Sequence, residues 1–162
     1  MKRGQFQLGF GMIFSIILII AFIIVAFIAF KAFFGVRCST EQGRFIYELQ
    51  NEIDRIWKGS GEDRIKEFKI LGCDFDYVCF WDPNVPSRGN FRTFEDDFSI
   101  FTGDEGNHNL YFYPRKKVEI SSTLIKHINM DFRENPVCFR NEENSVKIRL
   151  SKNIDEDLVR VS

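Results

Sequence analysis

Four cysteines are the side chains of this chain best suited to form cross-links. Thiols pair as disulfides or bind a soft metal, but no Cys-x-x-Cys is present and the spacing of the middle two matches no common zinc site. An even number in a small domain favours two disulfides in an oxidising compartment. The alternative is four reduced, buried thiols in a cytosolic domain. The pairing stays open among the disulfide candidates Cys38, Cys73, Cys79 and Cys138.

A polar loop at residues 103–109 offers oxygen and nitrogen atoms that a cation could use. The ligand order of an EF-hand is missing, and the two histidines are too far apart in sequence to indicate zinc. A solvated surface loop is therefore the better interpretation, and we expect no metal and no cofactor. The residues concerned are Asp104, Glu105, Asn107, His108 and Asn109, with His127 as the second histidine.

No catalytic motif is recognisable, so we expect no enzyme. The cluster Arg115-Lys116-Lys117 could contact anionic lipid headgroups, but a solvated strand end explains it more simply. Residues 36–162 hold 19 Lys and Arg against 23 Asp and Glu, a formal charge of −4. This mixed, mildly acidic balance argues against a nucleic-acid partner.

An apolar run of twenty-three residues, Leu8–Phe30, contains no charged side chain. As a helix it would measure roughly 35 Å, enough to cross a hydrocarbon core of about 30 Å. The run is longer than the apolar region of a secretory signal, and Phe residues flank the small Ala32 and Gly35 that follow. We therefore expect a retained transmembrane helix with membrane lipid as its surroundings.

The residues before this run form a short basic leader that ends in glycine, Lys2-Arg3-Gly4, followed by Gln5. This opening resembles the class III signal peptides of archaeal pilins and archaellins, which a membrane peptidase clips just before the apolar helix. The resemblance implies cleavage between Gly4 and Gln5. Gly9-Phe10-Gly11 resembles the early Gly-x-Gly of archaellins, whereas the glutamate of type IV pilins is absent, since Gly9 stands in its place. More loosely, the chain resembles small uncharacterised archaeal single-pass membrane proteins.

The orientation of the chain follows from the cysteines more than from charge, because the cations on either side of the helix nearly balance. We expect the N-terminus in the cytoplasm and the C-terminal domain outside the cell membrane. Gly11 and Ser15 place two small residues on one face of the helix, a weak contact for a second copy or a partner helix.

A second helical pattern begins near Ser39, with Gln42 in position to complete a capping box, and ends at Lys58. If Gly35 does not break the backbone, the two patterns merge into one helix from about Gln5 to Lys58. A half-apolar, half-amphipathic helix packed under a sheet resembles the pilin architecture. The alternative is two helices with a bend at Gly35.

Beyond Gly61 the pattern shortens to a period of two, which predicts strands. Phenylalanines three or four apart predict one short helix over 91–101. The fold class is therefore α+β: an N-terminal transmembrane helix packed, with its continuation, on a mostly antiparallel sheet. The expected strands are Lys66–Leu71, Asp74–Trp81, Leu110–Tyr113, Val118–Ile120, Leu124–Met130, and a hairpin of Val137–Arg140 and Ser145–Leu150 that turns through 141–144.

These patterns divide the chain into a leader or cytoplasmic tail at 1–7, a transmembrane helix at 8–30, a juxtamembrane segment at 31–38 and an extracytoplasmic domain at 39–162. We expect a membrane-anchored structural or interaction protein, with a pilin-like subunit as its specific form. The alternative is a small-molecule or ion-binding accessory domain of a larger membrane complex.

Overall fold

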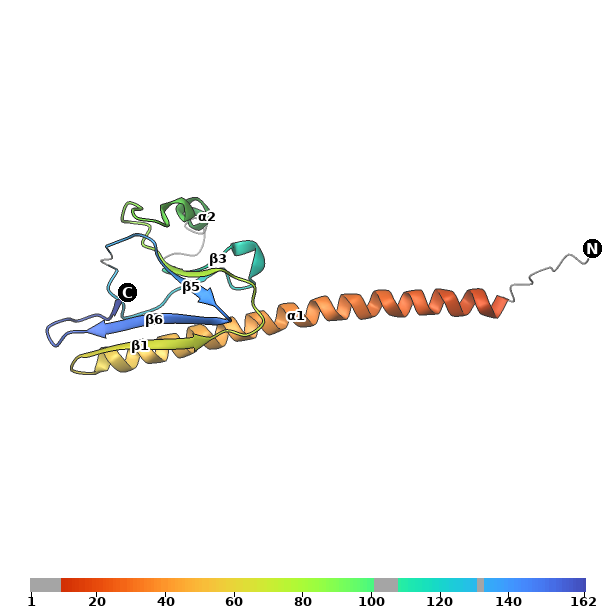
Figure 1. The fold of residues 1–162 in the computed structure, drawn as a ribbon, viewed down its shortest axis with the longest axis horizontal. Coiled ribbons are helices and arrows are strands. Elements are labelled where there is room, and N and C mark those ends of the chain that lie inside the picture. Colours follow the sequence, from red (N-terminus) through yellow and green to blue (C-terminus); the bar gives the residue numbers. More distant parts are fainter. Residues whose placement is uncertain (1–9, 101–107, 131–132) are drawn as a thin grey trace, which may run out of the picture. The chain divides into compact units, whose positions relative to one another are not determined.

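The computed structural model describes residues 10–100, 108–130 and 133–162 (Figure 1). The chain falls into two compact units that divide between Val36 and Arg37. The first unit holds the apolar helix. The second holds the strands of the described residues, and each unit is described by itself below.

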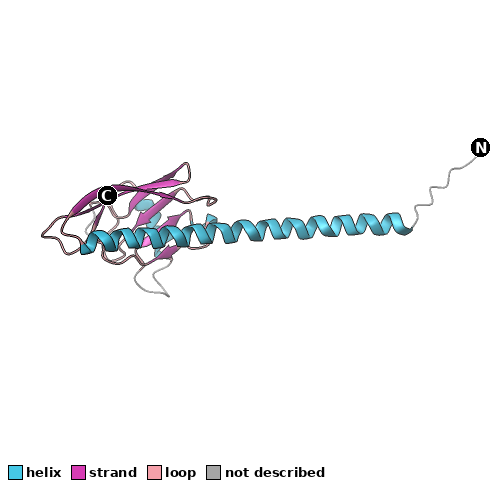
Figure 2. Ribbon diagram, turned by 90° about the horizontal axis from the view of Figure 1, so that it is seen from below, coloured by secondary structure: helices cyan, strands magenta, loops and turns pink. Residues whose placement is uncertain are grey.

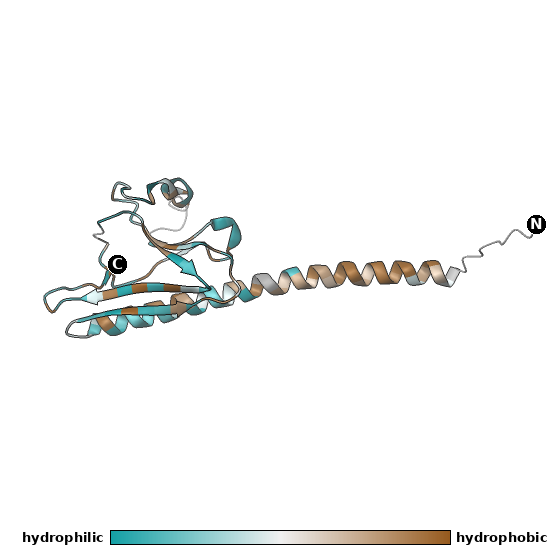
Figure 3. Cartoon of the chain, viewed as in Figure 1, coloured by the Kyte–Doolittle hydropathy of each residue, from teal (hydrophilic) through white to brown (hydrophobic). Residues whose placement is uncertain are grey.

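The helix α1 runs from Phe10 to Lys58 without a break at Gly35. From Gly11 to Phe33 every residue is exposed, and these residues are predominantly apolar (Figure 3). Among the described residues, this helix alone is long and apolar enough to cross a membrane. Because apolar side chains in water cost free energy, this surface suggests a single-pass anchor in lipid or in an apolar protein environment.

The part of α1 in the second unit is amphipathic. Phe45, Leu49, Ile53 and Ile56 recur every three or four residues and are buried to 1% exposure or less. The capping box expected at Ser39 is wrong, because the helix is already formed there and has no terminus to cap. The other end does have a cap: the Lys152 ammonium donates to the carbonyl oxygens of Trp57 (2.6 Å) and Gly59 (3.2 Å), where the helix leaves its last carbonyls unpaired.

The sheet has seven strands and only antiparallel pairings between them, which confirms the α+β fold (Figures 1 and 2). The strand order is β1-β6-β5-β2-β3-β4, and β7 pairs with β6. Two 3₁₀ turns and a short helix lie in the connections. The bounds are β1 Glu62–Lys69, β2 Tyr77–Phe80, η1 Arg92–Phe94, α2 Glu95–Ser99, β3 Leu110–Tyr113, η2 Arg115–Lys117, β4 Ser122–Thr123, β5 Val137–Glu142, β6 Ser145–Lys152 and β7 Arg160–Val161.

The strand β5 joins two halves of the sheet. Its first four residues, 137–140, pair with β2, and its last two pair with β6. The part of α1 that belongs to the second unit packs on one face of the sheet. On that face β6 contributes Val146, Ile148 and Leu150 to the core. A second, smaller core of Cys79, Trp81, Phe98 and Tyr111 lies under α2. The two faces of the sheet therefore have separate cores.

Several strand predictions need correction. β3 has the predicted bounds, whereas β1 starts four residues earlier than expected and β2 is shorter. The strands expected at 118–120 and 124–130 are wrong, since Ser122 and Thr123 form the strand β4 there and Ile128 forms no more than an isolated bridge with Val159. The helix expected over 91–101 is the turn η1 followed by α2, and Phe101 lies outside the described residues.

Side-chain amides explain why the segment 118–130 forms almost no strand. Gln42 accepts from the N–H of Ile120 (3.1 Å) and donates to its carbonyl (2.8 Å). Asn109 pairs in the same way with Ile125, at 2.8 Å for both bonds. Buried backbone groups need partners, and here amides supply what a neighbouring strand would otherwise supply.

Candidate functional site

The cysteines form two disulfides. Cys38 of α1 is joined to Cys73 in the connection after β1, and Cys79 of β2 is joined to Cys138, its direct partner in β5. No cysteine is free. Two disulfides suggest that the second unit lies in an oxidising, extracytoplasmic compartment.

The small residues Gly11 and Ser15 both lie on the exposed apolar helix. The Ser15 hydroxyl donates to the Gly11 carbonyl at 2.8 Å, so it is engaged within its own helix. Among the described residues, and apart from the adjacent backbone of the helix itself, no atom lies within 4 Å of a Cβ built on Gly11, which leaves room for a close approach. A helix–helix contact at this pair stays a prediction.

Two other predicted sites fall wholly or partly outside the described residues. The suspected cleavage point, Gly4 and Gln5, lies outside the described residues, so cleavage stays a prediction. Of the polar loop, 103–107 also lies outside. His108 bonds the Ser122 hydroxyl through Nδ1 at 2.8 Å, and Asn109 is occupied by Ile125. No cluster able to hold a metal occurs among the residues that the structure describes.

The second histidine, His127, takes part in packing within the domain. Its Nδ1 lies 2.8 Å from the Asp54 carboxylate, and its ring stacks on Trp57 with centroids 3.7 Å apart. This hydrogen bond lowers the pKa of Asp54. The cations at 115–117 form the turn η2 instead of a strand end, and Lys117 pairs with Asp74 at 3.4 Å.

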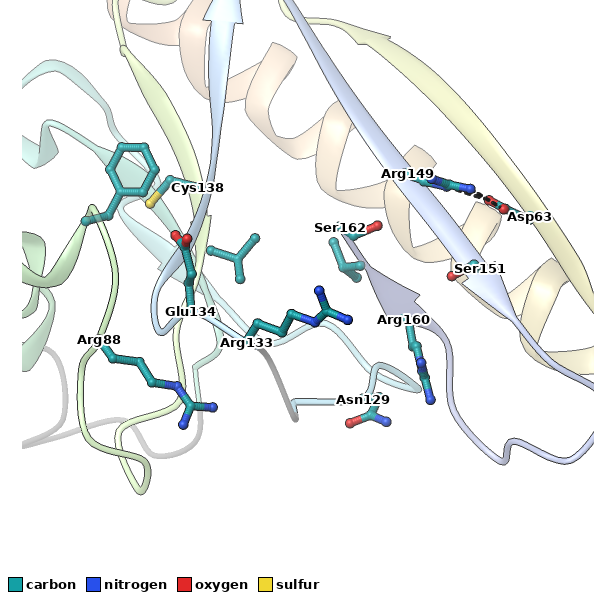
Figure 4. Close-up of a pocket in the computed structure, with 13 residues that line it drawn as sticks. Asp63, Arg88, Asn129, Arg133, Glu134, Cys138, Arg149, Ser151, Arg160 and Ser162 are labelled. Atoms are coloured by element: carbon teal, nitrogen blue, oxygen red, sulfur yellow. Dashed lines mark hydrogen bonds and ion pairs between the residues drawn. The ribbon is translucent and has the colours of Figure 1, made fainter.

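The structure also contains a cavity of about 760 Å³ that the sequence did not predict (Figure 4). It lies on the sheet face opposite α1. Side chains alternate between the two faces of a strand, and Ile148 and Leu150 of β6 face the helix. Arg149 and Ser151 therefore face the other side, where the cavity lies. The charged side chains that line it are Asp63, Arg88, Arg133, Glu134, Arg149 and Arg160.

Hydrogen bonds between loops fix the backbone that carries two of these arginines. Arg88 and Asn135 exchange two backbone bonds, at 2.7 and 3.0 Å. The buried Asn135 amide accepts from the N–H of Asp82 and donates to the carbonyls of Asp82 and Val85, at 2.7–2.9 Å. The loops of Arg88 and Arg133 are therefore braced against each other.

Arg149 and Arg160 each have a carboxylate partner. Arg149 forms a two-bond pair with Asp63, with Nε 2.8 Å from Oδ1, and this pair lowers the pKa of Asp63. Arg160 pairs with Glu156 from its own segment. Among the described residues, no carboxylate lies within ion-pair distance of Arg133. In Figure 4 Arg133 extends toward Arg160, whereas Glu134 turns away toward Cys138.

Sequence reasoning missed this cavity because no local spacing groups its residues. Arg88 and Arg160 are 72 positions apart in the sequence, and the order of the strands brings both to the wall of one cavity. Each arginine alone is an ordinary surface cation. No motif in the sequence could have brought them together.

No family model, curated protein or solved structure matches this chain. One long apolar N-terminal helix with an antiparallel sheet is compatible with a pilin-like fold.

Proposed function

We propose that this chain is a membrane-anchored structural subunit whose extracytoplasmic α+β domain contacts other proteins, in the manner of a pilin. The observation that supports the proposal most is the helix α1. One uninterrupted helix exposes apolar side chains from Gly11 to Phe33 and then packs its amphipathic continuation on an antiparallel sheet.

The exposed apolar segment needs surroundings other than water. Lipid satisfies this need for a single anchored copy, and neighbouring α1 helices would satisfy it equally in the core of a filament. The two disulfides support an N-terminus in the cytoplasm and a domain outside the cell membrane. The cations on either side of the helix nearly balance, so the orientation rests on the disulfides and not on charge.

The test is peptide mass spectrometry of the N-terminus of the native protein, combined with electron microscopy of the cell surface. A mature chain that begins at Gln5 is the expected result, with filaments that contain it. A Gly4→Val variant should stay unprocessed and form no filaments, while the matched Gly9→Val variant should still be cleaved. Native protein that retains Met1 or Lys2 would rule out the processing.

The cavity of the second unit favours the alternative function, a ligand-binding accessory domain. Its four arginines and its size are the specific observation. This alternative does not need filaments, and the ligand class that the cavity suits is argued next.

A further inference from the structure

We propose that the cavity lined by Arg88, Arg133, Arg149 and Arg160, the arginine cavity, binds a small anion that carries phosphate or paired carboxylate groups. The proposal concerns a ligand and goes beyond a structural role for the chain. It would stand whether or not the protein forms filaments.

The local charge is the first observation. Four guanidinium groups and two carboxylates of side chains line the arginine cavity, whereas residues 36–162 as a whole carry a net charge of −4. Cations are thus concentrated at one concave place of an otherwise acidic domain. Such a place attracts anions more strongly than scattered surface charges do, because low-dielectric walls focus the field.

The availability of the guanidinium groups is the second observation. Asp63 is paired with Arg149. In Figure 4 the Glu134 side chain points toward Cys138 and away from Arg133. The stem of Glu134 is confined there, since its Cγ lies only 2.8 Å from a Cβ built on Gly89. Arg133 therefore faces the open space of the cavity without a described carboxylate beside it.

The arrangement of the donors is the third observation. Arg88, Arg133 and Arg160 come from three segments and line the same cavity, together with Asn129 (Figure 4). The planar guanidinium fork matches the two oxygens of a carboxylate or phosphate. Because hydrogen bonds between the loops fix the backbones of Arg88 and Asn135, the backbone there needs little ordering when the ligand enters.

The size of the cavity limits the ligand to a small molecule. A volume of about 760 Å³ is within the range of ordinary ligand pockets, roughly 300–1,000 Å³. With Glu156 counted as the partner of Arg160, the side chains at the cavity carry an excess of one positive charge, which suits a small anion. Phe91 and Val137 add apolar wall for a carbon skeleton.

The experiment is isothermal titration calorimetry on the full chain in non-ionic detergent micelles. The probes are inorganic phosphate, glycerol 3-phosphate and succinate, each compared with sodium chloride at equal ionic strength. At least one probe should bind saturably. If glycerol 3-phosphate binds most tightly, the site takes organic phosphates. If succinate binds most tightly, it takes dicarboxylates, and if inorganic phosphate does, it takes the free ion. Each of these results supports the proposal.

Three variants locate the binding. Arg133→Gln should weaken it about tenfold or more, since a hydrogen-bonded charge is lost. Arg133→Lys keeps the charge without the fork and should weaken it less. Arg44→Gln, an exposed arginine of α1 that pairs only with Glu48 among the described carboxylates, is the matched control and should bind as the wild type does.

Two results would overturn the proposal. One is the absence of saturable binding of all three probes to the wild type. The other is an equal loss of affinity in Arg44→Gln and Arg133→Gln, which would indicate general attraction to surface charge. If Arg133→Gln fails to fold, the wild type and Arg133→Lys still decide the question.

Discussion

Gln42 shows how much one side chain contributes to this fold. It is fully buried on α1, and its amide forms both backbone hydrogen bonds of Ile120. Gln50, two turns further along the helix, binds Lys126 in the same way, at 2.8 Å and 3.3 Å. The two glutamines thereby attach the segment after β3 to the helix.

We predict that Gln42→Ala lowers the free energy of unfolding by about 1–3 kcal/mol, because the half-buried N–H and C=O of Ile120 lose their partner. Chemical denaturation of the full chain in detergent, followed by near-UV circular dichroism, would measure it. The neighbouring Glu41→Ala should change stability by less than about 0.5 kcal/mol. Equal losses in both variants would contradict the prediction.

Asp54 gives the domain a dependence on pH. Its hydrogen bond with His127 holds the pKa of this carboxyl below its ordinary value of 3.8, so the folded state favours the carboxylate. A lowered pKa contributes stability above the ordinary pKa and loses it as the pH falls through the folded pKa. We predict that Asp54→Asn is less stable than the wild type near neutral pH, and that the difference shrinks as the pH falls below about 3.8.

Unfolding curves between neutral pH and the acid limit of the fold would measure this difference. Asp74→Asn, which alters an exposed carboxylate paired with Lys117, is the control and should show a much flatter difference. Parallel pH profiles of Asp54→Asn and the wild type would contradict the prediction.

At the scale of elements, the turn between β5 and β6 is tighter than the sequence predicted. The strands continue to Glu142 and begin again at Ser145, so only Glu143 and Asn144 form the loop. Both have positive φ, 52° and 61°, as a type I′ turn requires. Asparagine adopts this conformation readily, but glutamate does so at a cost.

We predict that Glu143→Asn stabilises the domain by a few tenths to about 1 kcal/mol, because asparagine suits a positive φ better. Thermal unfolding in detergent would show the gain as a higher midpoint. Glu142→Asn, one residue earlier and in the strand, should give no gain. A lower midpoint for Glu143→Asn would contradict this account of the turn.

The disulfides connect elements that are distant in sequence. Cys38–Cys73 closes a loop with a separation of 35 residues, and Cys79–Cys138 closes one of 59. We predict that replacing either pair by alanine lowers the free energy of unfolding by about 2–5 kcal/mol, since the unfolded chain gains entropy. Unfolding of the double-alanine variants would measure the loss, and non-reducing peptide maps should contain the two named pairs only.

The sequence revealed elements whose signals are local. The apolar run, the period of Phe45, Leu49 and Ile53, and the strand ended by Pro114 all appear within short windows. It revealed neither the pairing of the cysteines nor the amide bonds of Gln42, since both depend on contacts distant in sequence. Gln42 on the apolar face of the helix is the one local signal of the amide bonds, and the same residue also fits a capping box.

For the whole molecule, the anchor has a large reserve of hydrophobicity. Sixteen of the residues 8–30 are Leu, Ile, Val or Phe, and together they contribute roughly −5 to −10 kcal/mol to the free energy of membrane insertion. One arginine at the centre of the helix costs about +3 kcal/mol on the same scale. We predict that Ile20→Arg still resists alkaline extraction from membranes. The same variant should abolish filaments, because a charge in a packed helical core finds no water.

The matched variant Ile20→Leu should behave as the wild type in both assays. Loss of Ile20→Arg from the membrane fraction would show that the anchor is weaker than its composition indicates. Normal filaments formed by Ile20→Arg would contradict a role for this segment in a filament core.

The two disulfides also determine how a tensile load would pass through the protein. A pull on the anchor reaches Cys38 and crosses directly to Cys73, so the chain from 39 to 72 bears no tension. The second bridge bypasses 80–137 in the same way. Most of the domain is thus mechanically shielded, and under a pull between the two ends of the second unit only 74–78 and 139–162 could lengthen before a covalent bond breaks. An object tethered by this protein would be held by sulfur bridges, whatever the thermodynamic stability of the sheet.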